Sequence, residues 1–122
     1  MKYMLLVHHN EESFAALSQA TQQQMLDESI ALTHRLHDKG QYVSASPLHR
    51  AASAAIVRVR DGKSAITDGP FIETHEQLAG YFLIEARDLT EAIRIATRVP
   101  GARIGSVEVR PVTEISGLPT QL

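Results

Sequence analysis

The sequence predicts a single α+β domain in which an antiparallel sheet carries helices on one face. Segments 2–8 and 80–86 are apolar runs of strand length, and segment 21–39 has apolar side chains at helical spacing. The predicted elements follow the order β-α-β, hairpin, β-α-β, and right-handed crossovers place both main helices on the same face. A length of 122 residues fits one such domain.

The two central strands predict that the protein forms a homodimer. Segments 2–8 and 80–86 are mostly apolar on both faces, whereas the helices cover one face only. An exposed apolar patch of that size is uncommon on a monomer. A second copy related by a two-fold axis would cover it.

Capping residues delimit the first two predicted helices. Asn10 is suited to cap a short helix at residues 11–17. Thr21 and Gln24 form a capping box that opens a longer helix, which runs to residue 39 and stops at Gly40. One face of this longer helix carries Gln22, Met25, Leu26, Ser29, Leu32, Thr33 and Leu36.

The remaining elements are marked by turn and cap residues. Extended chain at 41–46 ends at Pro47, and the dipeptide Asp61-Gly62 predicts a hairpin between strands 54–60 and 63–67. Asp88 caps a helix that ends at Pro100, and a last strand covers 104–112. Thr74 with Gln77 predicts one further helical turn just before the strand at 80–86.

A long motif follows the hairpin. Residues 67–71 read Thr-Asp-Gly-Pro-Phe, and Asp68, Gly69, Pro70 and Phe71 predict a sharp structural turn. Glu73-Thr74, Glu76-Gln77 and Gly80-Tyr81 continue the pattern, as do segments 1–6, 88–92 and 106–112. Over nearly the whole chain this sequence resembles the DGPF-domain proteins, a group of the YCII-related family.

The resemblance implies a ferredoxin-like βαββαβ fold with an extra β-hairpin, which dimerises as an α+β barrel. It places a single domain at residues 1–112 and a C-terminal tail at 113–122. Relatives are often encoded beside, or fused to, extracytoplasmic-function sigma factors, which implies a transcription-linked accessory role. Other relatives resemble lyases or dehalogenase-like enzymes, so the resemblance leaves the function open.

Composition narrows the classes of function. The formal net charge of −2 gives no reason to expect direct binding to nucleic acid or to an anionic membrane. The absence of cysteine excludes disulfides, a thiol nucleophile and thiolate metal ligands. The N-terminal apolar run is too short for a signal peptide, and we expect a cytoplasmic protein without a cofactor.

None of the six histidines lies in a motif that predicts a metal site. His8 and His9 are adjacent on a strand and therefore point to opposite faces. His34 and His37 have helical i, i+3 spacing, which binds a metal when a carboxylate joins from elsewhere in the fold. Because the histidines lack a convergent set of ligands, we predict no bound metal. In YCII-type relatives a proposed catalytic histidine lies eleven residues before the helix-ending glycine. Counting back from Gly40 places Ser29 there, which removes this candidate base.

Candidate site residues follow from their positions on the predicted sheet. Arg58, Glu85, Glu108 and Arg110 either line a cleft between the sheet and a partner subunit or form ordinary surface pairs. We predict ligand contacts for Ser29, Tyr81, Arg58 and Arg110. For a catalytic acid or base, the candidates are His8, His37, Asp68 and Glu73. The predicted function is small-molecule binding or a sigma-factor-linked accessory role, and the alternative is a small enzyme acting on an aromatic or organic-acid substrate.

Overall fold

The computed structural model describes residues 1–70 and 73–119 and contains two antiparallel sheets. The main sheet has the strand order β2-β5-β1-β6, and β3 pairs with β4 in a separate hairpin. The elements are β1 (Lys2–His9), α1 (Glu11–Ala15), α2 (Gln19–Asp38), β2 (Tyr42–Pro47), the 3-10 turn η1 (Ala51–Ser53), β3 (Ala55–Arg60), β4 (Lys63–Asp68), β5 (Gln77–Glu85), α3 (Leu89–Ala96), the 3-10 turn η2 (Pro100–Arg103) and β6 (Ser106–Pro111).

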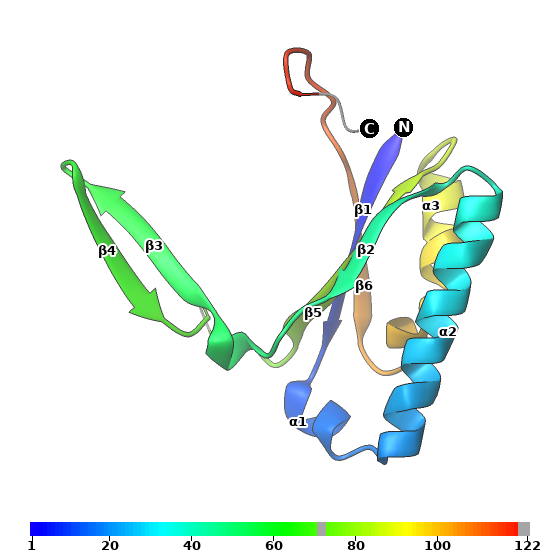
Figure 1. The fold of residues 1–122 in the computed structure, drawn as a ribbon, viewed down its shortest axis with the longest axis horizontal. Helices are drawn as coiled ribbons and strands as arrows, with labels where there is room; N and C mark the ends of the chain where they lie inside the picture. The colour runs from blue at the N-terminus through cyan, green and yellow to red at the C-terminus, as the bar shows by residue number, and fades with distance from the viewer. Residues whose placement is uncertain (71–72, 120–122) are drawn as a thin grey trace.

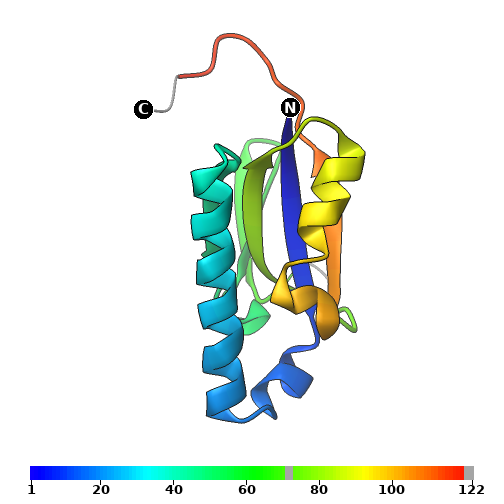
Figure 2. The same cartoon turned by 90° about the vertical axis from the view of Figure 1, so that its right-hand side faces the viewer.

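Helices α2 and α3 lie on the same face of the main sheet, as Figures 1 and 2 show from two directions. The α+β class, the antiparallel sheet and the extra hairpin are confirmed. This arrangement is compatible with the ferredoxin-like fold that the resemblance implied. Among the described residues, no helix has the length and apolar character needed to cross a membrane.

The core lies between the sheet and the two helices. Strand β1 pairs with β5 on one side and with β6 on the other, which makes it central. Leu5 of β1 and Ile84 of β5 are fully buried. They belong to one cluster with Leu32 and Leu36 of α2 and Ile95 of α3. The hydrophobic effect therefore fixes both helices to one face of β1 and β5.

Helix α2 begins earlier than the sequence predicted. Ser18 is the N-cap, because its side chain accepts a 3.1 Å hydrogen bond from the backbone N–H of Thr21. The predicted cap at Thr21 is therefore wrong, and Thr21 lies in the first turn. The earlier start is stabilised by Gln22, whose side-chain amide donates to the carbonyls of Phe14 and Leu17. These bonds tie α2 back to the preceding loop.

The predicted helical turn at Thr74 and Gln77 is also wrong. Gln77 is the first residue of β5 and pairs with His9 of β1, so β5 covers Gln77–Glu85 and begins before the predicted residue 80. The side chain of Gln77 accepts a 2.9 Å bond from Glu11 N–H and donates to the carbonyl of Thr74. The pair that resembled a capping box instead joins this loop to α1.

The β3–β4 hairpin forms as predicted and stands away from the main sheet (Figure 1). Asp61 and Gly62 have φ angles of 53° and 75°. Two successive positive φ angles are typical of a type I′ turn, which matches the twist of a hairpin. We call the hairpin, Ala55–Asp68, the arm.

The turn that ends the arm has the geometry that Gly69 permits. Gly69 has a φ of +92°, and its N–H donates a 2.7 Å hydrogen bond to the carbonyl of Ala54. This bond closes the base of the arm. Phe71, the last residue of the predicted motif, lies outside the described residues.

Replacement of Gly69 with valine is expected to destabilise the protein. Nothing lies within 4 Å of a Cβ at this position, so the cost comes from backbone strain and not from a clash. Strain of this kind costs about 1–3 kcal/mol of the free energy of unfolding. Chemical denaturation of Gly69→Val measures this cost, with Ser64→Val on the same hairpin as the control. Equal stability of the two variants would contradict the strain argument.

Candidate functional site

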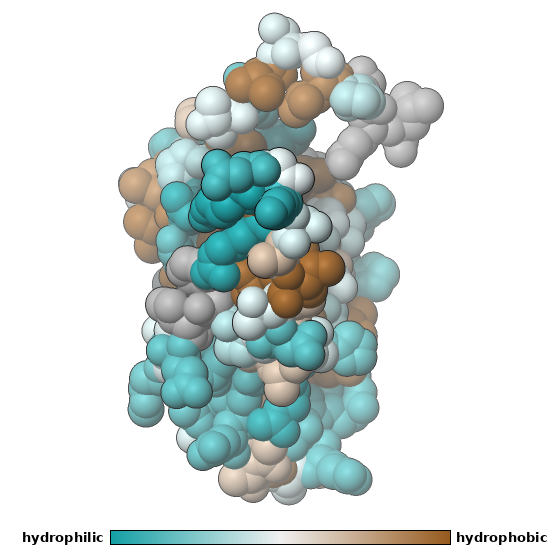
Figure 3. Space-filling model, turned by 90° about the vertical axis from the view of Figure 1, so that its left-hand side faces the viewer, coloured by the Kyte–Doolittle hydropathy of each residue, from teal (hydrophilic) through white to brown (hydrophobic). Residues whose placement is uncertain are grey.

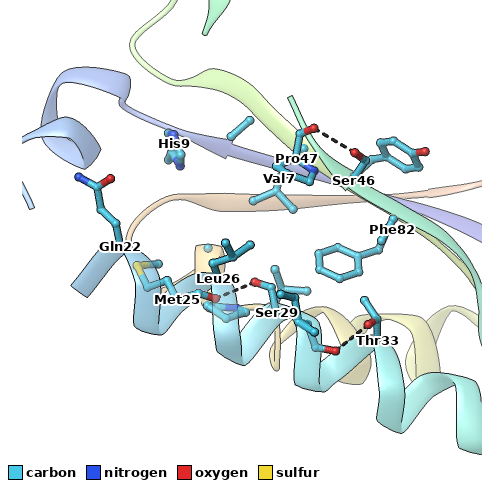
Figure 4. Close-up of a pocket in the computed structure, with 18 of the residues that line it drawn as sticks. Val7, His9, Gln22, Met25, Leu26, Ser29, Thr33, Ser46, Pro47 and Phe82 are labelled. Atoms are coloured by element: carbon cyan, nitrogen blue, oxygen red, sulfur yellow. Dashed lines mark hydrogen bonds between the residues drawn. The ribbon is translucent and has the colours of Figure 1, made fainter. Parts of the chain in front are cut away.

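A cavity of about 320 Å³ lies between α2 and the main sheet (Figure 4). This volume is within the range of small-molecule sites. Its lining comes from β1, α1, α2, β2, β5 and η2: Val7, His9, Phe14, Gln22, Met25, Leu26, Ser29, Ile30, Thr33, Tyr42, Ala45, Ser46, Pro47, Ala79, Gly80, Tyr81, Phe82, Val99, Pro100 and Gly101. We call this cavity the α2 pocket.

Most of the pocket wall is apolar. Val7 and Phe82 point from the sheet toward α2, where Met25 and Leu26 face them (Figure 4). Strand alternation places Val7 and Phe82 on the helix side, and the helical stripe predicted from the sequence places Met25 and Leu26 opposite. Leu26 keeps 44% of its surface exposed, so apolar area remains available to a ligand.

The pocket lining contains no aspartate, glutamate, lysine or arginine among the described residues. A charged ligand would lose its hydration here without gaining a counter-ion. The pocket therefore suits a neutral molecule.

Two hydroxyl groups on α2 have their hydrogen atoms engaged by the helix itself. Ser29 Oγ bonds to the carbonyl of Met25 at 3.0 Å, and Thr33 Oγ1 bonds to the carbonyl of Ile30 at 2.6 Å (Figure 4). A carbonyl oxygen can only accept, so each hydroxyl must donate. Each oxygen keeps lone pairs, and both residues line the pocket as hydrogen-bond acceptors.

Gln22 adds a third acceptor. Its Nε2 donates to the carbonyls of Phe14, at 3.2 Å, and Leu17, at 3.1 Å. These two bonds use both amide hydrogens and leave Oε1 able to accept. In Figure 4 the side chain lies beside the first turns of α2, at one end of the pocket.

His9 supplies an imidazole that the sequence analysis did not assign to a site. Its ring stacks on Phe14, with centroids 4.5 Å apart and planes at 11°. Burial lowers the pKa of His9 below its ordinary value of 6.5, and Glu11 and Glu76 partly oppose this effect. The side chain is therefore neutral at pH 7. Strand alternation could have found it, because His9 follows Val7 by two residues and shares its face.

The structure places two of the predicted ligand residues at the pocket. Ser29 lines it from α2, and Tyr81 is part of the β5 wall, although alternation turns its side chain toward the opposite face of the sheet. The Tyr81 hydroxyl lies 3.0 Å from Ser44 Oγ.

Two other predicted residues, His8 and Arg110, lie on the opposite face of the main sheet. Leu6 points away from the helices, and strand register pairs it with Tyr81 and Glu108. His8 and Arg110 follow Leu6 and Glu108 by two residues, so alternation turns their side chains away from the helices as well. Glu108 joins the two predicted residues: its carboxylate lies 3.5 Å from His8 Nε2 and 3.6 Å from Arg110 Nε. This group does not line the α2 pocket.

The remaining candidates are distributed over the surface. Arg58 is on β3 of the arm, and Asp68 ends β4. Glu73 is exposed and outside the pocket lining. His37, like its neighbour His34, is exposed on α2. Within residues 1–70 and 73–119, no three His, Asp or Glu side chains gather as a metal site would require.

The pH dependence of stability is expected to depend on His9. Because its pKa is lowered on folding, the unfolded chain binds more protons as the pH falls below about 6.5, and folding stability decreases. Denaturation of His9→Gln between about pH 7 and about pH 5 should show a weaker pH dependence than the parent protein. His34→Gln, which removes an exposed histidine, is the control. An unchanged pH profile in His9→Gln would contradict this assignment.

Comparison with known proteins identifies the family. The model of the YCII-related domain matches residues 1–116. An uncharacterised protein of Rhizobium meliloti (strain 1021) is 32% identical over 114 residues, which cover 92% of each chain. Both matches span nearly the whole sequence, and the family match includes every strand and helix of the described fold. The chain therefore belongs to the YCII-related family.

Proposed function

We propose that this protein binds a neutral, largely apolar small molecule that carries hydrogen-bond donors. One observation carries the proposal: the α2 pocket is lined by uncharged side chains, and the hydrogen bonds of Gln22, Ser29 and Thr33 leave acceptors there. Aromatic alcohols and amines have this chemistry.

The energetics of binding favour a neutral ligand with a hydrogen-bond donor over a carboxylate. Burial of apolar surface contributes about 25 cal/mol per Å² to binding. A ligand O–H or N–H that meets Ser29 or Thr33 adds roughly 0.5–1.5 kcal/mol for each hydrogen bond. A carboxylate has no cation to meet in the lining, and two acceptors would face each other unfavourably. The organic-acid class is therefore the less suited of the ligands considered.

The oligomeric state, location and accessory role that we propose follow the expectations from sequence. We propose a homodimer, because Met4, Leu6 and Leu83 form an apolar strip on the face of the sheet opposite the helices. A cytoplasmic location and an accessory role beside a sigma factor remain predictions of composition and resemblance. A ligand-binding protein with such a role would report the presence of its ligand.

The alternative function is a small enzyme acting on an aromatic substrate, and His9 favours it. A neutral imidazole can accept a proton from a bound O–H group, which is the role of a general base. Ser29 cannot take that role, because a serine hydroxyl has no useful basicity. If the protein is an enzyme, turnover should disappear in His9→Gln, whereas binding of the substrate should persist.

Binding of matched probes tests the ligand class. We expect 1-naphthol to bind more tightly than 1-methoxynaphthalene, by roughly 2- to 12-fold, because only the alcohol can donate a hydrogen bond. The anion 1-naphthoate should bind weakest. Isothermal titration calorimetry measures the dissociation constants of all three probes. Failure of both neutral probes to bind, or tightest binding of the anion, would contradict the proposal.

Substitutions at one hydroxyl locate the binding. Thr33→Val removes one of the three acceptors from the pocket and should reduce the preference for 1-naphthol over its methyl ether. Thr97→Val is the matched control, because Thr97 Oγ1 makes the same back-bond, to Arg94, on the exposed end of α3. Glu73→Gln should also leave binding unchanged, and its stability should stay within about 0.5 kcal/mol. Loss of the preference in Thr97→Val or Glu73→Gln would place the site elsewhere.

A further inference from the structure

The arm consists of two strands that pair only with each other among the described elements. It projects from the main sheet on the side opposite α2 and α3 (Figure 1). Isolated two-stranded hairpins are marginally stable in water, and they gain stability when one face packs against another surface. The arm therefore needs a packing partner that the single chain does not provide.

One face of the arm is apolar and exposed. Register pairs Val57 with Ile66, and alternation places Val59 on the same face. The exposed fractions of Val57, Val59 and Ile66 are 63%, 59% and 70%. The opposite face carries Arg58, Arg60 and Lys63. In Figure 3, which looks at the arm from its free side, hydrophobic side chains lie beside a hydrophilic patch. The arm is therefore amphipathic.

The accessible surface area of the chain indicates how much area is available to form an interface. A compact monomer of 13.4 kDa would expose about 6500 Å². This chain exposes 8694 Å², an excess of about 2200 Å². The arm and the segment after β6 both stand away from the sheet in Figure 1 and contribute to the excess. A stable interface buries about 800 Å² on each partner, so the excess is large enough to supply one.

A second apolar surface lies on the same side of the molecule as the arm. Met4 and Leu6 of β1 and Leu83 of β5 turn away from the helices and are half-buried. Figure 1 shows the arm and this face of the sheet as the two sides of an open angle. One chain thus carries two apolar surfaces on the side of the main sheet opposite the helices, one on the arm and one on the sheet itself.

We propose that the apolar face of the arm packs on a second copy of this chain, so that two arms clasp the dimer reciprocally. A two-fold axis brings each arm to the other subunit and covers both kinds of apolar surface at once. An unrelated partner would have to match the arm and the sheet face separately. This inference rests on the proposed homodimer and adds the arm, through Val57, Val59 and Ile66, as its contact.

Two neighbouring substitutions test the role of the apolar face. Ile66→Glu places a charge on that face, and Thr67→Glu places the same charge on the opposite face of the same strand. Sedimentation equilibrium should show a dimer for the parent protein and for Thr67→Glu. The dimer dissociation constant of Ile66→Glu should rise about tenfold or more, because a buried carboxylate loses its hydration. Equal dimer dissociation constants in the two variants, or an unchanged dissociation constant in Ile66→Glu, would overturn the proposal.

Hydrogen exchange provides a second measurement without a substitution. Amides in residues 55–68 should exchange more slowly at hundred-micromolar than at low-micromolar concentration, because the arm is covered in the dimer. A parent protein that is monomeric at both concentrations would overturn the dimer and the arm contact together. A parent dimer whose arm exchanges equally at both concentrations would overturn the arm contact alone. The α2 pocket lies within one chain, so Ile66→Glu should still bind 1-naphthol whether or not it dimerises. This binding distinguishes failure of the dimer proposal from failure of the ligand proposal.

Discussion

Packing of α2 against β1 and β5 is the interaction on which the rest of the molecule depends. Leu32 and Leu36 of α2 are almost fully buried against Leu5 and Ile84. Their burial removes apolar surface from water and fixes the helix over the centre of the sheet. Strand alternation then divides the protein into a helix side and an open side, and each proposed activity belongs to one of them.

The α2 pocket occurs where this packing becomes incomplete. Toward the C-terminal end of α2, Leu32 and Leu36 are buried against the sheet, whereas Met25 and Leu26 in the N-terminal half, with Ser29 about one turn further, line a cavity. Gln22 and Ser18 hold this half of the helix in place by hydrogen bonds to the loop and the first turn. The pocket therefore combines a rigid frame with unfilled apolar space, which is the combination that a ligand site requires.

On the open side of the protein, apolar side chains remain exposed to water. Pairing of β3 with β4 satisfies the backbone groups that face each other within the arm, and the valines on one face of β3 stay in water. The same side carries the ionic group of His8, Glu108 and Arg110 at the margin of the sheet. An apolar surface with a charged margin is typical of a protein interface. The proposed ligand site and the proposed dimer contact thus occupy separate surfaces and can be tested separately.

Local sequence signals predicted most of the secondary structure. Residues 2–8 alternate along β1, Asp61-Gly62 forms the hairpin turn, and Asp88 caps α3. Two capping-box predictions failed, because Ser18 competes with Thr21 and because Gln77 bonds to Glu11, sixty-six residues away. Such a contact depends on which segments the fold brings together, and no local pattern carries it.

The sequence by itself determined the fold class, the face of α2 that meets the sheet and the position of Ser29 on that face. Periodicity is a local property, and it decides which side chains share a surface. The tertiary structure alone decided that Ser29 and His9 line one cavity. It also separated the arm from the sheet. These features depend on distances between elements far apart in the chain, which packing and strand register set.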